Sequence, residues 1–67
     1  MEEKLYSDYI ERISICAEDM PEEKAIGIAR AQVLLDLDPK EYPANKRYGM
    51  VGRFRRRARE EGIIENN

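Results

Sequence analysis

The residues of this chain best suited to binding chemistry are arginines concentrated in residues 46–59. That stretch holds seven positive charges and no negative one. A guanidinium forms two parallel hydrogen bonds with a phosphate or a carboxylate, so such a row can bind a nucleic-acid backbone or an acidic protein. Tyrosine beside it could stack on an unpaired base. The candidate binding residues are Lys46, Arg47, Tyr48, Arg53, Arg55, Arg56, Arg57 and Arg59.

A helix must position these side chains, and the pattern predicts one over about residues 46–61. With about 3.6 residues per turn, one sector of that helix is apolar and the opposite side is cationic. Asn45 is the predicted N-cap and Gly62 the predicted residue after the last turn. The apolar sector holds Met50, Val51, Phe54 and Ala58, near the direction of Arg47; Arg53, Arg56 and Arg57 lie opposite, flanked by Arg55 and Arg59.

Two further helices are expected before it. Apolar residues spaced three or four apart predict a helix over about residues 3–18, with Cys16 buried on its apolar side. A second helix over about 20–36 is apolar around more than half its circumference, so we expect it to be central. Asp19 is its predicted N-cap. Gly27 within it suggests the close approach of a neighbouring helix. A short helical turn is expected near 39–42.

These elements predict an all-α fold, a compact three-helix bundle forming one domain over residues 1–67. Sixty-seven residues are enough for one domain only. Residues 65–67 are expected to fray. No apolar stretch approaches the ~20 residues that span a bilayer, so we expect no membrane partner and a cytoplasmic location.

The small net charge of −2 hides a strong asymmetry. Residues 1–44 carry five bases and eleven acids, a charge of −6, whereas residues 45–67 carry seven bases and three acids, a charge of +4. A charge near zero would argue against a polyanionic partner if it were evenly spread. Because the charges are segregated along the chain, the small net charge does not argue against a polyanionic partner.

Enzyme chemistry is not expected. The chain has no histidine and one cysteine, Cys16, so nothing activates a nucleophile and no cysteine-based zinc site can form. Ser7 and Ser14 likewise lack a histidine base. The carboxylates near Asp36 and Asp38 suit helix and turn capping better than a calcium loop. We therefore expect no cofactor, no metal and no catalytic residue.

Two functions stay open on these residues. The leading prediction is a small non-enzymatic regulatory or accessory protein that contacts DNA or RNA through the arginine-rich third helix. The alternative is a protein-interaction module or inhibitor that binds an acidic surface, or self-associates, through the same helix. The arginines could also be merely solvated or paired with the acidic first half of the bundle. Glu60 and Glu61 would limit how far a phosphate backbone follows the helix.

A bare GxxG at residues 49–52 matches the backbone-clamping loop of KH domains. Its middle residues are apolar and no strand is predicted, so we interpret the two glycines as a close helix crossing or a weak helix start. A functional role would require the backbone of a partner to approach them closely.

Overall fold

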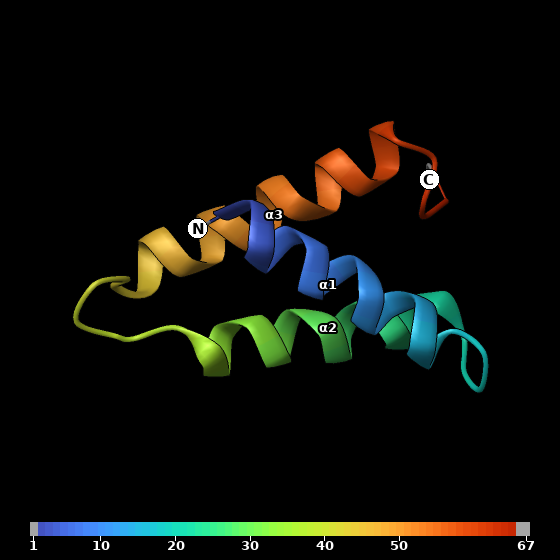
Figure 1. Ribbon diagram of the computed structural model, residues 1–67, viewed down its shortest axis with the longest axis horizontal. Helices are drawn as coiled ribbons and strands as arrows, with labels where there is room; N and C mark the ends of the chain where they lie inside the picture. Colours follow the sequence, from blue (N-terminus) through green and yellow to red (C-terminus); the bar gives the residue numbers. More distant parts are fainter. Residues whose placement is uncertain (1, 66–67) are drawn as a thin grey trace.

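The computed structural model describes residues 2–65 and consists of three α-helices, α1 (Glu2–Cys16), α2 (Glu22–Asp36) and α3 (Ala44–Glu60) (Figure 1). The described part of the chain contains no strand. The predicted all-α three-helix bundle is confirmed. Within residues 2–65, no helix has both the length and the apolar character needed to cross a membrane.

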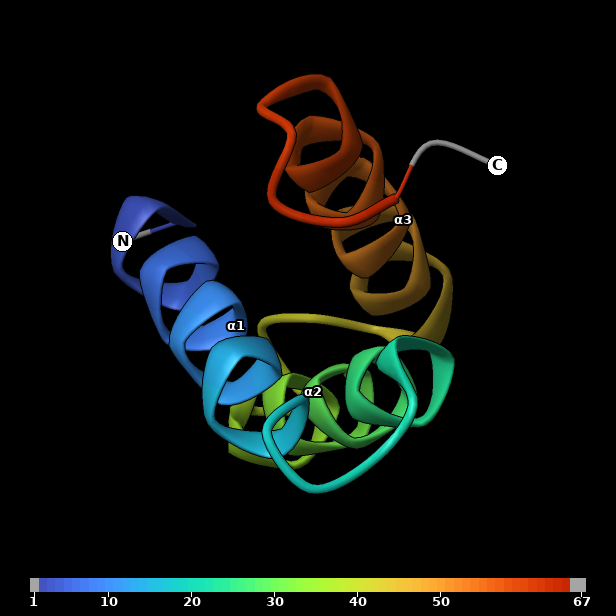
Figure 2. The ribbon, with the colours of Figure 1, turned by 90° about the vertical axis from the view of Figure 1, so that its right-hand side faces the viewer.

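The chain reverses direction between successive helices, and α1 and α3 both pack on one side of α2 (Figure 2). The long axis of the molecule measures 33 Å. The expectation that α2 would be the central helix is not met: each helix contacts the other two, and the side of α2 away from α1 and α3 lies open to solvent.

The core is a single apolar cluster to which all three helices contribute. An aromatic group lies at its centre, with the Phe54 ring 5.4 Å from Tyr6 and 5.7 Å from Tyr9 between centroids. Burial of such rings dominates the stability of a small bundle. Cys16 packs against the cluster but is only half-buried. The other buried members are Ile13, Ala25, Ile26, Ala29, Val33, Leu37, Met50, Val51, Ala58 and Ile64.

Both predicted N-caps are wrong, and proline is the reason. Helices α2 and α3 begin directly after Pro21 and Pro43, whose side chains make no cap hydrogen bond. The residue before a proline is disfavoured in the helical region, so neither helix extends back past its proline. The prolines take extended ψ angles of 147° and 162°, and their carbonyls accept the first helical hydrogen bonds. Asn45 therefore lies inside α3, and Asp19 lies in the turn after α1.

The C-terminal end of α3 was predicted correctly to within one residue. Gly62 adopts a positive φ of 76°, as a residue ending a helix does. The amide of Gly62 bonds the carbonyl of Arg59 and that of Ile63 bonds Ala58, which together form a Schellman motif. This reversal buries Ile64 against the core, and the Glu65 amide donates to Glu22 at 2.9 Å. Of the residues expected to fray, 66 and 67 lie outside the described part.

The short helical turn expected near 39–42 is present as a single turn: the amides of Glu41 and Tyr42 donate to the Asp38 carbonyl, three and four residues back, and the Lys40 amide donates to the Asp38 side chain. The close helix approach expected at Gly27 is wrong. A Cβ added there would have no neighbour within 4 Å, because Gly27 lies on the open side of α2.

Candidate functional site

Three consecutive arginines of α3 extend in three directions. Successive helical residues are turned by about 100°, so Arg55, Arg56 and Arg57 lie towards α2, towards solvent and towards α1. The predicted apolar edge is confirmed, since its four residues are the buried ones of α3. The cationic face opposite it is divided into two flanks and an outward line. We define the outward line as Asn45, Gly49, Gly52, Arg56 and Arg59, which are spaced four, three, four and three residues apart.

The flank towards α2 is occupied by Arg55. Its Nη2 donates to both carboxylate oxygens of Glu23, at 2.9 and 3.2 Å. Arg55 is half-buried whereas the Glu23 side chain is largely exposed. The pair joins α3 to the first turn of α2.

The flank towards α1 is occupied by Arg57 and, one turn earlier, by Arg53. Arg57 holds Glu3 through two nitrogens, at 2.6 and 3.3 Å, and its Nε donates to Glu61 at 3.0 Å. Arg53 approaches Glu2 at 3.5 Å, with both side chains more than half exposed. Arg57 is therefore tightly held, whereas Arg53 makes one loose contact.

A tyrosine completes the arrangement around Arg57. The guanidinium carbon lies 4.0 Å from the centre of the Tyr6 ring, and the Tyr6 hydroxyl donates to Glu61 at 2.6 Å. Tyr6, Glu61 and Arg57 thus contact one another pairwise, and Glu3 closes the group from α1. We call these four residues the Arg57 cluster. It fastens the C-terminal end of α3 to the N-terminal end of α1.

The pKa values within the Arg57 cluster follow from these contacts. Burial, together with the hydrogen bond to Glu61, raises the pKa of Tyr6 to about 12. The hydrogen bond from Tyr6 and those from Arg57 lower the pKa of Glu61, and the hydrogen bonds and charge of Arg57 lower the pKa of Glu3. Both carboxylates also raise the pKa of Arg57. The cluster is therefore fully charged, with Tyr6 neutral, around pH 7.

The outward line differs from both flanks. Arg56 is exposed and Arg59 is half-buried, and neither forms an ion pair with any residue of 2–65. Towards the N-terminus the line continues as Gly52 and Gly49. A Cβ added at Gly52 would meet nothing within 4 Å, and one at Gly49 would meet only an Arg53 nitrogen at 3.8 Å. The outward line is thus a bare strip of helix backbone that ends at two unpaired arginines.

The remaining predicted binding residues lie near the start of α3. Tyr48 is 51% exposed, and the Arg30 guanidinium lies over its ring, 5.1 Å from the centroid. Lys46 lies 4.9 Å from the Tyr42 ring centre. Arg47 is half-buried beside the apolar edge, and its Nε is buried with no hydrogen-bond partner among the described residues. Tyr48 and Lys46 are accessible to a partner, whereas Arg47 is largely turned inward.

The structure separates the eight candidate residues more than the sequence analysis expected. Arg53, Arg56 and Arg57 were placed on one side, but Arg57 is packed against Tyr6. The alternative that the arginines pair with the acidic first half of the bundle is confirmed for Arg53, Arg55 and Arg57. A helical projection of α3 contains no information about neighbouring helices, so it could not name the glutamates involved. Of the paired glutamates, only Glu61 could have been predicted from the local sequence, because it follows Arg57 by four residues, a spacing at which opposite charges meet on a helix. The unforeseen participants are Glu2, Glu3, Tyr6, Glu23, Arg30 and Glu61.

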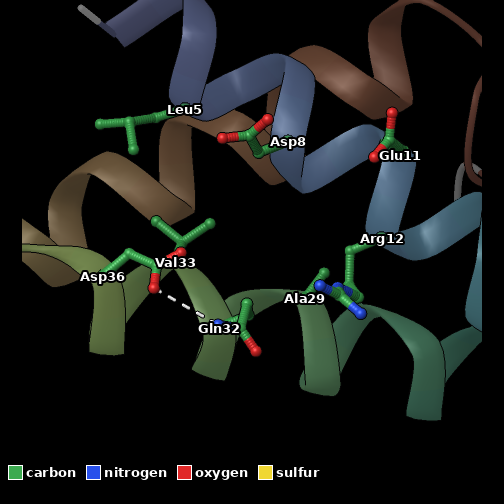
Figure 3. A pocket seen from close by; sticks show the side chains of 8 residues that line it. All are labelled: Leu5, Asp8, Glu11, Arg12, Ala29, Gln32, Val33 and Asp36. Carbon is green, nitrogen blue, oxygen red and sulfur yellow. Dashed lines mark hydrogen bonds between the residues drawn. The ribbon is translucent and has the colours of Figure 1, made fainter.

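A cleft of about 140 Å³ lies elsewhere, between α1 and α2 (Figure 3). Leu5, Ala29 and Val33 are its apolar lining residues, and on one side the Gln32 side chain donates a hydrogen bond to Asp36 at 3.3 Å. No group of three or more histidine, cysteine, aspartate or glutamate side chains within residues 2–65 is placed to hold a metal ion. The lining residues are Leu5, Asp8, Glu11, Arg12, Ala29, Gln32, Val33 and Asp36.

Comparison of the chain with protein-family models, with curated proteins and with solved structures finds no match.

Proposed function

We propose that this chain is a small non-enzymatic binding protein that contacts the phosphate backbone of nucleic acid along the outward line of α3. The observation that carries the proposal is the pair Arg56 and Arg59, which form no ion pair within residues 2–65 and lie at the end of a strip where Gly49 and Gly52 carry no side chain. Such a strip lets a partner backbone come close to the helix while the arginines reach its phosphates.

The charge around α3 supports this proposal even after the ion pairs are counted. Residues 46–59 carry seven positive charges, and the four carboxylates that contact them leave an excess of three. Exposed ion pairs contribute only about 0–1 kcal/mol each, so a phosphate can displace a carboxylate at little cost. Arg53 is the first candidate for such an exchange, because its contact with Glu2 is long and exposed. Tyr48 offers a ring for stacking on an unpaired base.

The experiment is a titration of labelled duplex DNA, duplex RNA and single-stranded RNA at several salt concentrations. The logarithm of the affinity falls with the logarithm of salt by about 0.9 per duplex phosphate contact. Replacing both unpaired arginines, Arg56→Gln and Arg59→Gln, should reduce that slope by about 2 and weaken binding on every sequence.

A matched control is available in Arg12→Gln with Lys40→Gln, which removes the same charge from exposed positions outside α3 that form no ion pair within residues 2–65. It should bind nearly as the wild type does. An equal loss in both double variants would show that only net charge matters, and no binding at low salt would refute the proposal.

A second candidate is an acidic protein partner at the same arginines. Arg55 and Arg57 bind glutamates of α2 and α1, respectively, and these ion pairs within the chain support a partner that offers carboxylates. In that case the outward-line double variant loses a protein complex while nucleic acid fails to bind the wild type. Light scattering of the mixture with a polyglutamate peptide distinguishes the two.

A further inference from the structure

Helix α2 presents apolar side chains on the side that no other helix covers. Its buried residues face α1 and α3, which both lie on one side of it (Figure 2). On the opposite side, Leu35 is 79% exposed and Ile28 is 37% exposed. Gly27 and Ala31 lie on the same side and are also exposed. Burying the exposed Leu35 and Ile28 side chains against a partner would remove apolar surface from water, so this side of α2 is suited to contact with another helix.

Gly27 gives the shape of that partner. It lies in the middle of α2, where glycine weakens a helix, and no residue of its own chain uses the space it leaves. The space is open, and Leu35 protrudes two turns further along the same side. The exposed side of α2 therefore offers both an open space at Gly27 and a protruding side chain at Leu35.

We propose that two copies of this chain pair through these surfaces, with their α2 helices antiparallel and crossing at Ala31. In this arrangement a residue that precedes Ala31 in one helix lies opposite the residue that follows Ala31 by the same number of positions in the other helix. Leu35 of one copy enters the space at Gly27 of the other. This contact occurs twice, as a two-fold axis requires. Small residues at the crossing allow the two helices to approach closely.

Charge complementarity favours a second copy over an unrelated helix. Lys24 lies at the N-terminal end of the strip, and Asp38 follows its C-terminal end; both are exposed. The antiparallel arrangement brings the N-terminal end of each α2, with Lys24, to the C-terminal end of the other, where the chain continues into the turn that holds Asp38, and it also opposes the two helix dipoles. A parallel arrangement would bring like charges together at both ends. The outward line of α3 remains uncovered in this dimer, because α3 packs on the other side of α2.

The test is the molar mass of the full chain, measured by light scattering and sedimentation equilibrium from micromolar to millimolar concentration. We expect a concentration-dependent rise from 7.9 kDa to twice that value. Leu35→Gln should shift the dissociation constant by at least tenfold towards monomer while leaving the helical circular dichroism unchanged, because an exposed side chain contributes little to the monomer.

Gly27→Leu provides a second variant with effects of opposite sign. It fills open space in the monomer and raises helix propensity, so the monomer should melt at a higher temperature, but it occupies the space that Leu35 needs and should abolish the dimer. The reversal Lys24→Glu should weaken the dimer, and adding Asp38→Lys should restore it.

Arg56→Gln with Arg59→Gln is the control, and it should dimerise as the wild type does, which separates this surface from association through α3. The proposal fails if the wild type stays monomeric at millimolar concentration. It also fails if Leu35→Gln and Gly27→Leu dimerise as the wild type does.

Discussion

Arg56 and Arg57 are neighbours with the same side chain, yet they occupy opposite environments. Arg57 contacts two carboxylates and the face of an aromatic ring, whereas Arg56 extends into solvent without an ion-pair partner in residues 2–65. The difference arises from a rotation of about 100° along one helix. It teaches that an arginine-rich helix can divide its residues between holding the fold and binding a partner.

The flanks share a further property that the outward line lacks. Their interhelical partners, Glu2, Glu3 and Glu23, all lie in the first turns of α1 and α2. Acidic side chains there are already favourable, because they face the positive end of the helix dipole. Each glutamate therefore supports its own helix and anchors α3. The arginines of the outward line form no such ion pair with another helix within residues 2–65.

The largest expected effect on stability comes from replacing Arg57, and the same replacement at Arg56 provides the comparison. Arg57→Gln removes both ion pairs and the contact with Tyr6, so thermal unfolding should shift down by several degrees. Arg56→Gln should leave the melting temperature almost unchanged, because its side chain contacts no carboxylate. Differential scanning calorimetry of the two variants measures this. Equal shifts would show that the outward line and the flanks do not differ in their contribution to stability.

A smaller effect is expected from the Tyr6 hydroxyl, and it depends on pH. The pKa of Tyr6 is raised to about 12 from an ordinary value of 10.0, so the folded protein favours the neutral ring. That stability is fully present below pH 10 and is lost as the pH rises towards 12. Tyr6→Phe should cost about 1 kcal/mol at pH 7 and should make the alkaline loss shallower. Urea unfolding between pH 7 and 12 tests both.

The same cluster predicts the opposite trend in acid. The pKa values of Glu3 and Glu61 are lowered in the folded protein, so their contribution is present above the ordinary value of 4.5 and is lost as the pH falls through the lowered values. Tyr6→Phe keeps Arg57, so it should retain most of the acid sensitivity associated with Glu3. Loss of that sensitivity in Tyr6→Phe would contradict the assignment of Glu3 to Arg57.

The smallest effect sharpens the outward line itself. Gly52→Ala adds one methyl group where no atom lies within 4 Å, and it should stabilise α3 by about 0.5–1 kcal/mol through helix propensity. If a phosphate backbone approaches the bare strip, the same methyl group should weaken nucleic-acid binding several-fold. Thermal unfolding and the titration described above measure the two changes. Unchanged affinity would show that the glycines do not contact the partner.

The helices could be predicted from sequence because apolar spacing is a local property. Their starts could not, since the predictions relied on the side chains of Asp19 and Asn45 while the backbone limits of Pro21 and Pro43 decided the matter. Gly62 was predictable because a helix that ends there needs a positive φ.

The candidate site was predictable only as a concentration of charge. Which arginines remain unpaired depends on contacts such as Arg55 with Glu23, between residues 32 positions apart in sequence. The spacing of apolar and charged residues along the sequence does not predict such a contact. Cys16 illustrates the same limit, because its place on the apolar side of α1 was correct but its degree of burial depends on how α2 lies beside it.

The reversal at Gly62 has a consequence for synthesis on the ribosome. Ile64 completes the core, and it follows α2 by 28 residues, which take roughly one to six seconds to translate at typical rates. Helices and hairpins form within microseconds, so α1 and α2 have time to form and pair before Phe54 and Ile64 are synthesised. Phe54, which packs on the rings of Tyr6 and Tyr9, follows α2 by 18 residues, so it is absent for the first part of that interval. The nascent chain therefore presents an apolar seam that a chaperone could bind.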